Sequence, residues 1–464
     1  MRLAGPQNPK NCQKLDRVAK VGLGPLFRQP GKQPADRGHV LFYRGGAADL
    51  NGFRHTQGLS PGKDGFDEIR LELADRNWNN LCMTPSLELR HSVLVPGAQD
   101  YLRFSESAEF PAFVRSSKGA YLVSMEGTLI TDLYCGSGAV ILGHGDEQQV
   151  DYLRRNLDHG ASVSLRHPIE LSVALKLYSL MPGIDRWMFF KTGSECVHLA
   201  LRVAREHTGR RVIISFGYHG WVAPFGFPRQ EMKSVDLVEC GWNVEAARLQ
   251  IREVSSSLAA VIVSPSPYIT DPSFYSMLRE ESERCGALLI MDEIKSGFRW
   301  MFPCLSHCFD LRPDLLLLSK AIANGFPIAA LGGRSDLLDS KEKVSVFSTF
   351  ANENMSLFAA MHCLQRLESG AYQEFATATT RFHGLLTEAL RAHEIQLIGT
   401  PTFFRLELPA CMDRVDVAVA MWKEHILFHP KDEVLLTAAH NDPSLLSECA
   451  ERFVAVLSAA LYAS

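Results

Sequence analysis

Two short apolar runs of this chain each end at an ionisable residue of a type that carries chemistry. The first run, Leu288–Met291, leads into Asp292, and the second, Leu315–Leu318, leads to Lys320. Such runs are typical of strands buried on both faces in a parallel sheet. Ligands of open α/β sheets bind at the carboxyl ends of strands, so we expect Asp292 and Lys320 to face one crevice. A lysine that can form a Schiff base and a carboxylate that keeps a pyridine nitrogen protonated are what pyridoxal phosphate chemistry needs.

A second pattern lies in Lys191–Glu195, which follows an apolar run and opens a stretch with helical periodicity. Gly193 lets the backbone approach a ligand closely. Ser194 supplies a hydroxyl, and the free N–H groups of a first helical turn attract anions. An ordinary helix cap would use the same residue types. Because this cap would stand at the carboxyl end of a strand, a phosphate site is favoured.

The following predicted strand leads into a short loop, Gly217-Tyr218-His219-Gly220-Trp221. A tyrosine at this edge could stack on a flat heteroaromatic ring, and the adjacent histidine could donate or accept a hydrogen bond. Packing of the loop would use the same side chains. From these residues alone, loop packing is the favoured interpretation.

Composition argues against several classes of protein. The 464 residues are 46% hydrophobic and 22% charged, with a formal net charge of -4, and lack the clustered basic excess of a nucleic-acid surface. No apolar run approaches the length of a membrane span, and the N-terminus lacks the apolar core of a signal peptide. The 11 scattered cysteines fit a reducing cytoplasm. Cys304, His307 and Cys308 lack a second ligand pair, so no metal site is expected.

The chain is long enough for more than one domain, and its patterns predict four stretches. Residues 1–85 are rich in Gly, Pro, Asn and basic residues and are expected to form a poorly ordered extension, with Met83 as an alternative natural start. Residues 86–140 are expected to begin a small domain, 141–343 to form a large cofactor-binding domain, and 344–464 to complete the small α+β domain.

Within the large domain, short apolar runs alternate with helical stretches, which predicts a doubly wound α/β fold with a mainly parallel sheet. The predicted strands are Trp187–Phe190, Val212–Phe216, Ala259–Ser264, Ala287–Met291 and Leu315–Leu318, and the predicted helices include Ser194–His207 and Phe274–Cys285. Later in the chain the pattern predicts helices over Met355–Ser369, Glu374–His393 and Pro443–Ala460, with a strand at Thr402–Leu408.

From about Glu88 to the C-terminus, the chain resembles the class III pyridoxal-phosphate aminotransferases of fold type I, in particular the glutamate-1-semialdehyde aminomutase-like branch. The matching motifs occur in the family's order: Gly143-His144, Thr192-Gly193-Ser194-Glu195, Thr208-Gly209-Arg210, Tyr218-His219-Gly220, Asp292-Glu293-Ile294-Lys295-Ser296-Gly297-Phe298-Arg299, the stretch from Ser319-Lys320 to Ala329, and Ser348-Thr349-Phe350 followed by Glu353 and Ser356-Leu357. The resemblance implies a large doubly wound domain with a smaller α+β domain, and pyridoxal 5'-phosphate as cofactor.

The resemblance also implies catalytic and cofactor-binding roles. Lys320 would be the Schiff-base lysine and proton shuttle, and Asp292 would pair with the ring nitrogen. The implied ring contacts are Tyr218 stacked on one face, with His219 beside it, and Ile294 on the other face. The phosphate would be held by Gly193 and Ser194, and by Thr349 of the neighbouring subunit in a homodimer.

The substrate side departs from the family pattern. Gly136-Ser137 stand where the aminomutase carries Ser-Trp, and its substrate-carboxylate arginine corresponds to Arg103 only with a one-residue gap. Ser264 replaces the usual acidic residue after its strand. The residues that we expect to contact substrate are Arg103, Ser137, Glu353 and Glu433.

Three functions remain open from the sequence. The first is a cytoplasmic transaminase that moves an amino group from an amino donor to an aldehyde or ketone, including sugar-derived acceptors. The second is an aminomutase, such as glutamate-1-semialdehyde 2,1-aminomutase, or an epimerase. The third is a non-catalytic binding protein on the same fold, against which the retention of both Asp292 and Lys320 argues.

Overall fold

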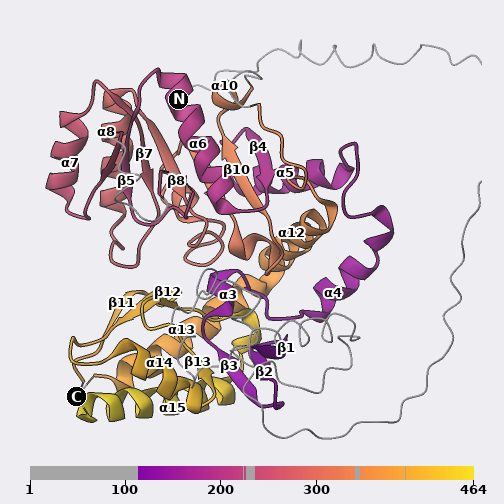
Figure 1. Ribbon diagram of the computed structural model, residues 1–464, viewed down its shortest axis with the longest axis vertical. Helices are drawn as coiled ribbons and strands as arrows, with labels where there is room; N and C mark the ends of the chain where they lie inside the picture. The colour runs from indigo at the N-terminus through magenta and orange to yellow at the C-terminus, as the bar shows by residue number, and fades with distance from the viewer. Residues whose placement is uncertain (1–112, 223, 226–235, 340–344, 392, 464) are drawn as a thin grey trace, which may run out of the picture. The chain divides into compact units, whose positions relative to one another are not determined.

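The computed structural model describes residues 113–222, 224–225, 236–339, 345–391 and 393–463 (Figure 1). All of them belong to one compact unit, Asn79–Ser464. Arg103, Met83 and the predicted extension over 1–85 lie outside the described residues. No helix in the described part of the chain is long and apolar enough to cross a membrane.

The largest sheet has seven strands in the order β4-β10-β9-β8-β7-β5-β6 (Figure 1). All its neighbouring pairs are parallel except those of β10, which runs antiparallel to both β4 and β9. Its strands are β4 Arg186–Phe190, β5 Val212–Phe216, β6 Leu237–Glu239, β7 Leu258–Val263, β8 Leu288–Asp292, β9 Leu315–Leu318 and β10 Ala329–Gly333. The predicted fold class, α/β with a large, mainly parallel sheet, is confirmed, and smaller sheets accompany it.

The central strands are apolar because helices cover both faces of this sheet. Along β8, Leu289 and Met291 pack into one core cluster, and Leu288 and Ile290 pack into another. Helix α6 covers the second face, whereas α5, α8 and α12 contribute to the cluster on the first. The helices associated with this sheet are α4 Glu147–Arg154, α5 Pro168–Leu180, α6 Gly193–Thr208, α7 Val244–Glu253, α8 Pro272–Cys285, α9 Leu305–Cys308, α10 Ser335–Leu338 and α12 Asn354–Arg366, with short helices η2 Leu157–His159 and η3 Lys320–Ala323.

Two smaller sheets come from the N-terminal and C-terminal parts of the described chain. One has the order β1-β2-β3-β13 and the other β11-β12-β14. A separate apolar cluster, with Phe382, Phe428 and Phe453 among its largest members, fills the space between these sheets and their helices. The elements are β1 Val114–Lys118, β2 Tyr121–Ser124, β3 Leu129–Asp132, the turn α3 Cys135–Gly138, η4 Leu367–Ala371, α13 Tyr372–Ala389, β11 Gln396–Thr400, β12 Phe403–Glu407, α14 Arg414–Lys423, β13 Ile426–Leu427, β14 Glu433–Val434, η5 Ala438–His440 and α15 Pro443–Ala463.

Asn324 fastens the segment after β9 to the chain near α4. Its Oδ1 accepts from the N–H groups of Ile141 and Leu142, both at 2.9 Å. Its Nδ2 donates to the carbonyl of Gly143 at 3.0 Å and to Gln149 Oε1 at 2.9 Å. The residue is 6% exposed and has a φ of 49°, a backbone conformation that asparagine tolerates better than most residues. These bonds fix the short helix η3, which begins at Lys320.

Replacing Asn324 with Ala should therefore destabilise the protein markedly. Four buried hydrogen bonds lose their partner, which is expected to lower the free energy of unfolding by roughly 2–4 kcal/mol. The measurement is the midpoint of thermal unfolding of the cofactor-saturated protein. Asn243→Ala is the control, because it removes one cap bond at the exposed start of α7 and should cost only about 1 kcal/mol. Equal midpoints for the two variants would contradict the role given to Asn324.

Candidate active site

Asp292 stands at the carboxyl end of β8, 2% exposed, with its carboxylate held from two sides. Its Oδ2 lies 2.7 Å from Nδ1 of His219, and its Oδ1 accepts from the N–H of Ile294 at 3.3 Å. His219 is itself buried, and its Nε2 has no hydrogen-bond partner among the described residues. His219, expected beside the cofactor ring, thus contacts the carboxylate that would hold that ring.

Lys320 follows the neighbouring strand β9, so it lies at the same edge of the sheet as Asp292. Its φ of 49° is unusual for a side chain of this size, and such strain is found mainly at functional sites. Burial and the positive charge of Lys295 together lower the pKa of its amine from 10.5 to about 8, against the opposing effect of the carboxylates of Asp432, Glu433 and Asp292. A lysine of this kind is neutral, and therefore nucleophilic, at a pH much closer to neutrality than usual.

The N-terminus of α6 meets this edge at Gly193 and Ser194. Thr192 caps the helix in a capping box with Glu195, which leaves the next N–H groups of the first turn directed outward. A Cβ on Gly193 would lie 2.5 Å from Cδ1 of Ile294, so only glycine permits this close packing. Two segments that the sequence singled out, one after β4 and one after β8, are therefore in direct contact.

The loop after β5 lies against the same helix end. Gly220 has a φ of 90°, and a Cβ there would lie 2.2 Å from Oγ of Ser194. Glycine is thus needed both for the backbone conformation and for the close approach. Tyr218 in this loop is 64% exposed, which leaves much of its side chain accessible to a ligand. The structure brings Gly193, Ser194, the 217–221 loop and Ile294 together.

Ser137 lies in a turn, α3, in which four consecutive residues, Cys135–Gly138, have positive φ. Its Oγ accepts from the hydroxyl of Tyr134 at 3.1 Å. The Tyr134 ring stacks on His429 with centroids 5.2 Å apart. Arg299 fixes the end of the turn. Its side chain is completely buried and donates to the carbonyl groups of Gly138, Val140 and Leu436.

Glu433 lies next to Lys295, a residue to which the sequence had assigned no role. Nζ of Lys295 contacts both Glu433 and the adjacent Asp432. Burial and the neighbouring Asp432 raise the pKa of Glu433, against the lowering effect of the charge of Lys295. The signal that could have identified Lys295 was its place in the motif, three residues after Asp292. No signal in the sequence linked it to residues 432 and 433.

The carboxylate oxygens of Glu353 are already bonded to neighbouring groups of the protein. It caps α12 by accepting from the N–H groups of Met355 and Ser356, and it forms an ion pair with Lys191 at 2.9 Å. Its substrate-binding role stays a prediction. The contacts place Glu353 close to the start of α6, because Lys191 directly precedes the cap residue Thr192.

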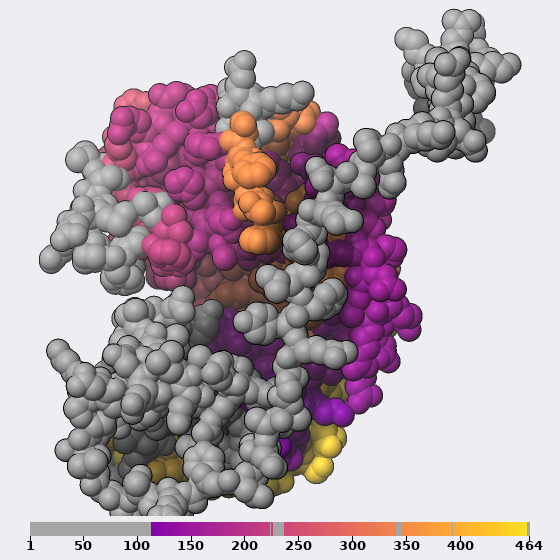
Figure 2. Space-filling view, turned by 45° about the vertical axis from the view of Figure 1, so that its right-hand side comes forward, coloured from indigo at the N-terminus to yellow at the C-terminus, as the bar shows by residue number. Residues whose placement is uncertain are grey.

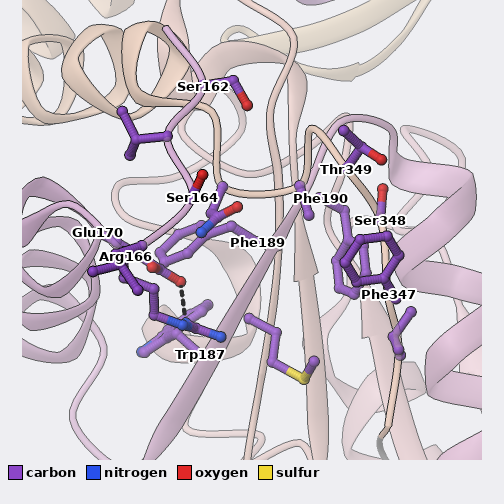
Figure 3. Close-up of a pocket in the computed structure, with 16 residues that line it drawn as sticks. Ser162, Ser164, Arg166, Glu170, Trp187, Phe189, Phe190, Phe347, Ser348 and Thr349 are labelled. Carbon is purple, nitrogen blue, oxygen red and sulfur yellow. Dashed lines mark hydrogen bonds and ion pairs between the residues drawn. The ribbon is translucent and has the colours of Figure 1, made fainter. Parts of the chain in front are cut away.

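Thr349 lines a pocket of about 540 Å³ that does not include Asp292 or Lys320. The segment 345–352 lies on the surface, in orange in Figure 2, and Phe347 in it is 93% exposed. Figure 3 shows Ser348 and Thr349 on one side of this pocket and the ion pair of Arg166 and Glu170 on the other. Within one chain, the lining of the cavity beside Thr349 therefore does not include the two residues expected to carry the chemistry.

Cys304, His307 and Cys308 lie at the start of and within the short helix α9. Cys304 is buried and its thiol is 3.5 Å from the hydroxyl of Ser306. Among the residues that the structure describes, no three His, Cys, Asp or Glu side chains converge on a point where a metal ion could bind.

The electrostatic link between Lys295 and Lys320 gives a testable pH dependence. Lys295→Met removes a nearby positive charge and leaves Asp432 and Glu433 facing Lys320, so the pKa of Lys320 should rise above about 8. The neutral amine would then form only at higher pH. The rate at which cofactor-free protein combines with pyridoxal phosphate is followed by absorbance and plotted against pH. The rising limb of this plot should shift to higher pH. Lys431→Met, which removes an equal charge from an exposed side chain, is the control, and identical limbs for the two variants would contradict the link.

Comparison with known proteins identifies relatives of this arrangement. The chain is 33% identical over 310 residues to the glutamate-1-semialdehyde 2,1-aminomutase of Pyrobaculum aerophilum, covering 61% of this chain and 73% of that one. It is 29% identical over 375 residues to the 2'-deamino-2'-hydroxyneamine transaminase of Streptomyces kanamyceticus, covering 76% and 93%. The FumI protein of a Sphingopyxis species, solved in a PLP internal aldimine form, superimposes with a TM-score of 0.75 at 23% identity, covering 81% of this chain and 96% of that one.

The described residues fit pyridoxal 5'-phosphate. A buried carboxylate and a lysine stand at adjacent strand ends, and a glycine-lined helix N-terminus meets the same edge. The family model for aminotransferase class III matches residues 104–225 and 227–404, well over half of the chain. The chain therefore belongs to the class III aminotransferases, a family of enzymes that use pyridoxal 5'-phosphate.

Proposed function

We propose that this enzyme is a transaminase that transfers an amino group from a small-molecule amino donor to an aldehyde or ketone, with sugar-derived carbonyl compounds among the acceptors. The observation that carries the proposal is the placement of Asp292 and Lys320 at the ends of neighbouring parallel strands. The likeness to a transaminase named for a neamine derivative supports the sugar-derived class.

Each residue of the candidate site would have its own role in binding the cofactor or moving a proton. Pyridoxal phosphate supplies, when bound, an aldehyde that takes up the amino group and a ring that accepts electrons. Asp292, held by His219, would pair with the ring nitrogen, and Gly193 and Ser194 would bind the phosphate at the start of α6. Lys320 would use Nζ as general base to remove the proton from the substrate carbon, and as general acid to return it.

Tyr218 and Ile294 would hold the ring between them. The exposed ring of Tyr218 offers one apolar surface, and Ile294 offers another from the segment that follows Asp292. Substrate contacts are proposed for Ser137, Glu353 and Glu433, and also for Arg103, which lies outside the described residues.

An aminomutase is the second candidate, and the likeness to glutamate-1-semialdehyde 2,1-aminomutase favours it. The two functions differ in whether an amino donor and an acceptor are separately consumed. In a transaminase, the nitrogen taken from a donor remains on the enzyme until a second carbonyl compound removes it.

The test is a half-reaction screen. Amino donors are mixed one at a time with the purified, cofactor-loaded protein, and the absorbance of the cofactor is followed before an acceptor is added. A transaminase should release one carbonyl product per site and should consume added keto acid stoichiometrically. Turnover of an amino aldehyde with no consumption of added keto acid would identify an aminomutase and contradict the proposal.

Asp292→Asn tests the role of the carboxylate. An amide cannot stabilise a positively charged ring nitrogen, so cofactor binding should persist while the rate of proton removal from the donor falls by about 100-fold or more. The rate is measured by stopped-flow absorbance with a donor found in the screen. Asp310→Asn, an exposed aspartate, is the matched control. A near-normal rate in Asp292→Asn would show that another group controls the ring.

We further propose a homodimer in which Thr349 binds the cofactor phosphate of the partner subunit. Thr349 is separate from Lys320 within one chain, and exposed apolar side chains surround it: Leu165, 84% exposed, and Phe347, 93% exposed. Exposed apolar surface of this kind is typical of an interface.

Mixing two defective variants tests the shared site. Lys320→Ala and Thr349→Ala dimers are dissociated, combined and reassociated, and activity is assayed at a cofactor concentration that leaves each variant alone nearly inactive. One site of every mixed dimer would carry both defects and the other none, so about a quarter of wild-type activity should return. In the control for the procedure, Lys320→Ala is combined with Thr387→Ala in place of Thr349→Ala. Thr387 is an exposed threonine on α13. Mixed dimers that form without restored activity would contradict the shared site.

A further inference from the structure

One surface segment, residues 345–353, carries Thr349 and leads into α12. We call it the Thr349 segment. Its first residue is held by α6, because Arg202 on that helix donates to the carbonyl of Ser345 at 2.9 Å. The helix whose N-terminus forms the candidate phosphate site therefore also holds the start of this segment.

The end of the Thr349 segment is held by Lys191, the residue between β4 and the cap of α6. Its Nζ donates to Oε2 of Glu353 at 2.9 Å, and the two side chains are only 18% and 15% exposed. Burial would raise the pKa of Glu353, but the hydrogen bonds from Lys191 and Ser356 outweigh burial and hold the pKa below its usual value. The carboxylate is therefore charged at neutral pH, and a charge-assisted hydrogen bond of this kind is stronger than one between neutral groups.

A further anchor fixes the place where the segment enters α12. Asn354 is completely buried and donates to the carbonyl groups of residues 160–161, from Nδ2 at 2.9 Å and from its N–H at 2.7 Å. Between the anchors, the N–H of Ala351 donates to the carbonyl of Ser348 at 3.2 Å, a bond within the segment itself. The position of Thr349 therefore depends on the anchors at the two ends.

Lys191 is also connected to the candidate phosphate site of its own chain. Its backbone N–H donates at 3.2 Å to Oε2 of Glu195, the carboxylate that closes the capping box of α6 with Thr192. Two effects of Lys191 on cofactor binding are therefore distinct. One acts on the phosphate site of its own chain, and the other acts through the Thr349 segment on the site that Thr349 reaches.

The side-chain contacts favour the effect through the segment. The start of α6 keeps its cap without the Lys191 amine, because Thr192 and Glu195 bond to each other. The amine is bonded instead to Glu353, the residue that caps α12. Loss of the amine should thus leave the start of α6 in place and release the end of the Thr349 segment.

We propose that Lys191 is a positioning residue that acts through Glu353 to set the place of Thr349, and thereby strengthens the binding of the cofactor phosphate in the partner subunit. The inference deepens the proposed homodimer with shared sites and rests on it. It assigns to a lysine of one chain an effect on the cofactor of the other chain.

The first test compares pyridoxal phosphate with pyridoxal, which has no phosphate. Each is titrated into cofactor-free protein, and its dissociation constant is obtained from the absorbance of the cofactor joined to Lys320. Lys191→Met should weaken the binding of pyridoxal phosphate about 10-fold and change that of pyridoxal by less than about twofold. Lys176→Met is the matched control, because Lys176 is also 18% exposed and paired with a glutamate, but lies on α5. It should leave both constants unchanged.

Glu353→Gln tests whether Lys191 acts through Glu353. No substrate is present in these titrations, so a contact between Glu353 and substrate does not affect them. The variant should reproduce the loss seen in Lys191→Met, and the double variant should bind pyridoxal phosphate no more weakly than either single variant. Additive losses, or an equal loss for pyridoxal, would overturn the inference. If Lys191→Met does not fold, Glu353→Gln carries the same comparison.

Mixed dimers show which chain's site is affected. Lys320→Ala on one of two differently tagged chains ensures that only the site of the other chain is read. When Lys191→Met is on the chain that keeps Lys320, an intact Thr349 segment reaches the site that is read, and pyridoxal phosphate should bind as in the wild type. When Lys191→Met is on the same chain as Lys320→Ala, binding should be about 10-fold weaker. The opposite assignment would show that Lys191 acts on its own site and would overturn the inference.

The same two arrangements with Thr349→Ala test the proposed homodimer separately. A defect that follows the chain carrying Thr349→Ala would mean that the site is not shared, and the proposed homodimer would be wrong. If the Thr349→Ala defect lies in the partner's site while Lys191→Met has no effect there, the shared site stands and only the inference about Lys191 fails.

Discussion

The register between β8 and β9 is the constraint on which the rest of the site depends. The two strands are parallel, and Asp292 pairs with Leu317, so the segment after β9 turns at the same edge where the carboxylate stands. Both strands are buried on both faces, which leaves this edge as the place where their polar ends can meet a ligand. A shift of one residue would turn the Asp292 side chain to the opposite face.

Several interactions then hold other segments against this edge. His219 and Ile294 contact Asp292. Gly193 allows the start of α6 to pack against Ile294, and Gly220 allows the loop after β5 to pack against Ser194. Arg299 donates to three carbonyl groups from two distant segments, 138–140 and 436, and thereby ties the loop after β8 to the turn that carries Ser137. The site is thus built from several parts of the chain around one pair of strand ends.

Much of the sheet could be predicted from sequence because its strands are apolar throughout. The predicted strands Val212–Phe216 and Leu315–Leu318 agree with β5 and β9, and the boundaries of β4, β7 and β8 differ by one residue. Strand β10 was missed because it reads Ala-Ala-Leu-Gly-Gly, with little strand propensity. Its small residues are required by packing: a Cβ on Gly332 would lie 2.5 Å from the ring of Trp187. That contact joins segments far apart in the sequence and leaves no local pattern.

In the candidate site, too, contacts between segments far apart in the sequence could not be predicted from local patterns. Asp292, Lys320, Gly193 and Ser194 stand at strand or helix ends, where local pattern predicts their place. Lys295 and Asp432 are 137 residues apart, and only the folded chain shows that they meet. The link of His219 to Asp292 likewise depends on the neighbouring positions of β5, β7 and β8 in the sheet.

The central claim is that Lys320, and not the nearby Lys295, carries the cofactor. The most direct measurement is reduction of the pyridoxal-phosphate-loaded protein with borohydride, followed by digestion and peptide mass spectrometry. The account predicts a pyridoxyl phosphate group fixed to Lys320 with close to one group per chain, and an unmodified Lys295. Modification of Lys295, or the absence of any fixed group in protein that has been shown to contain the cofactor, would contradict it.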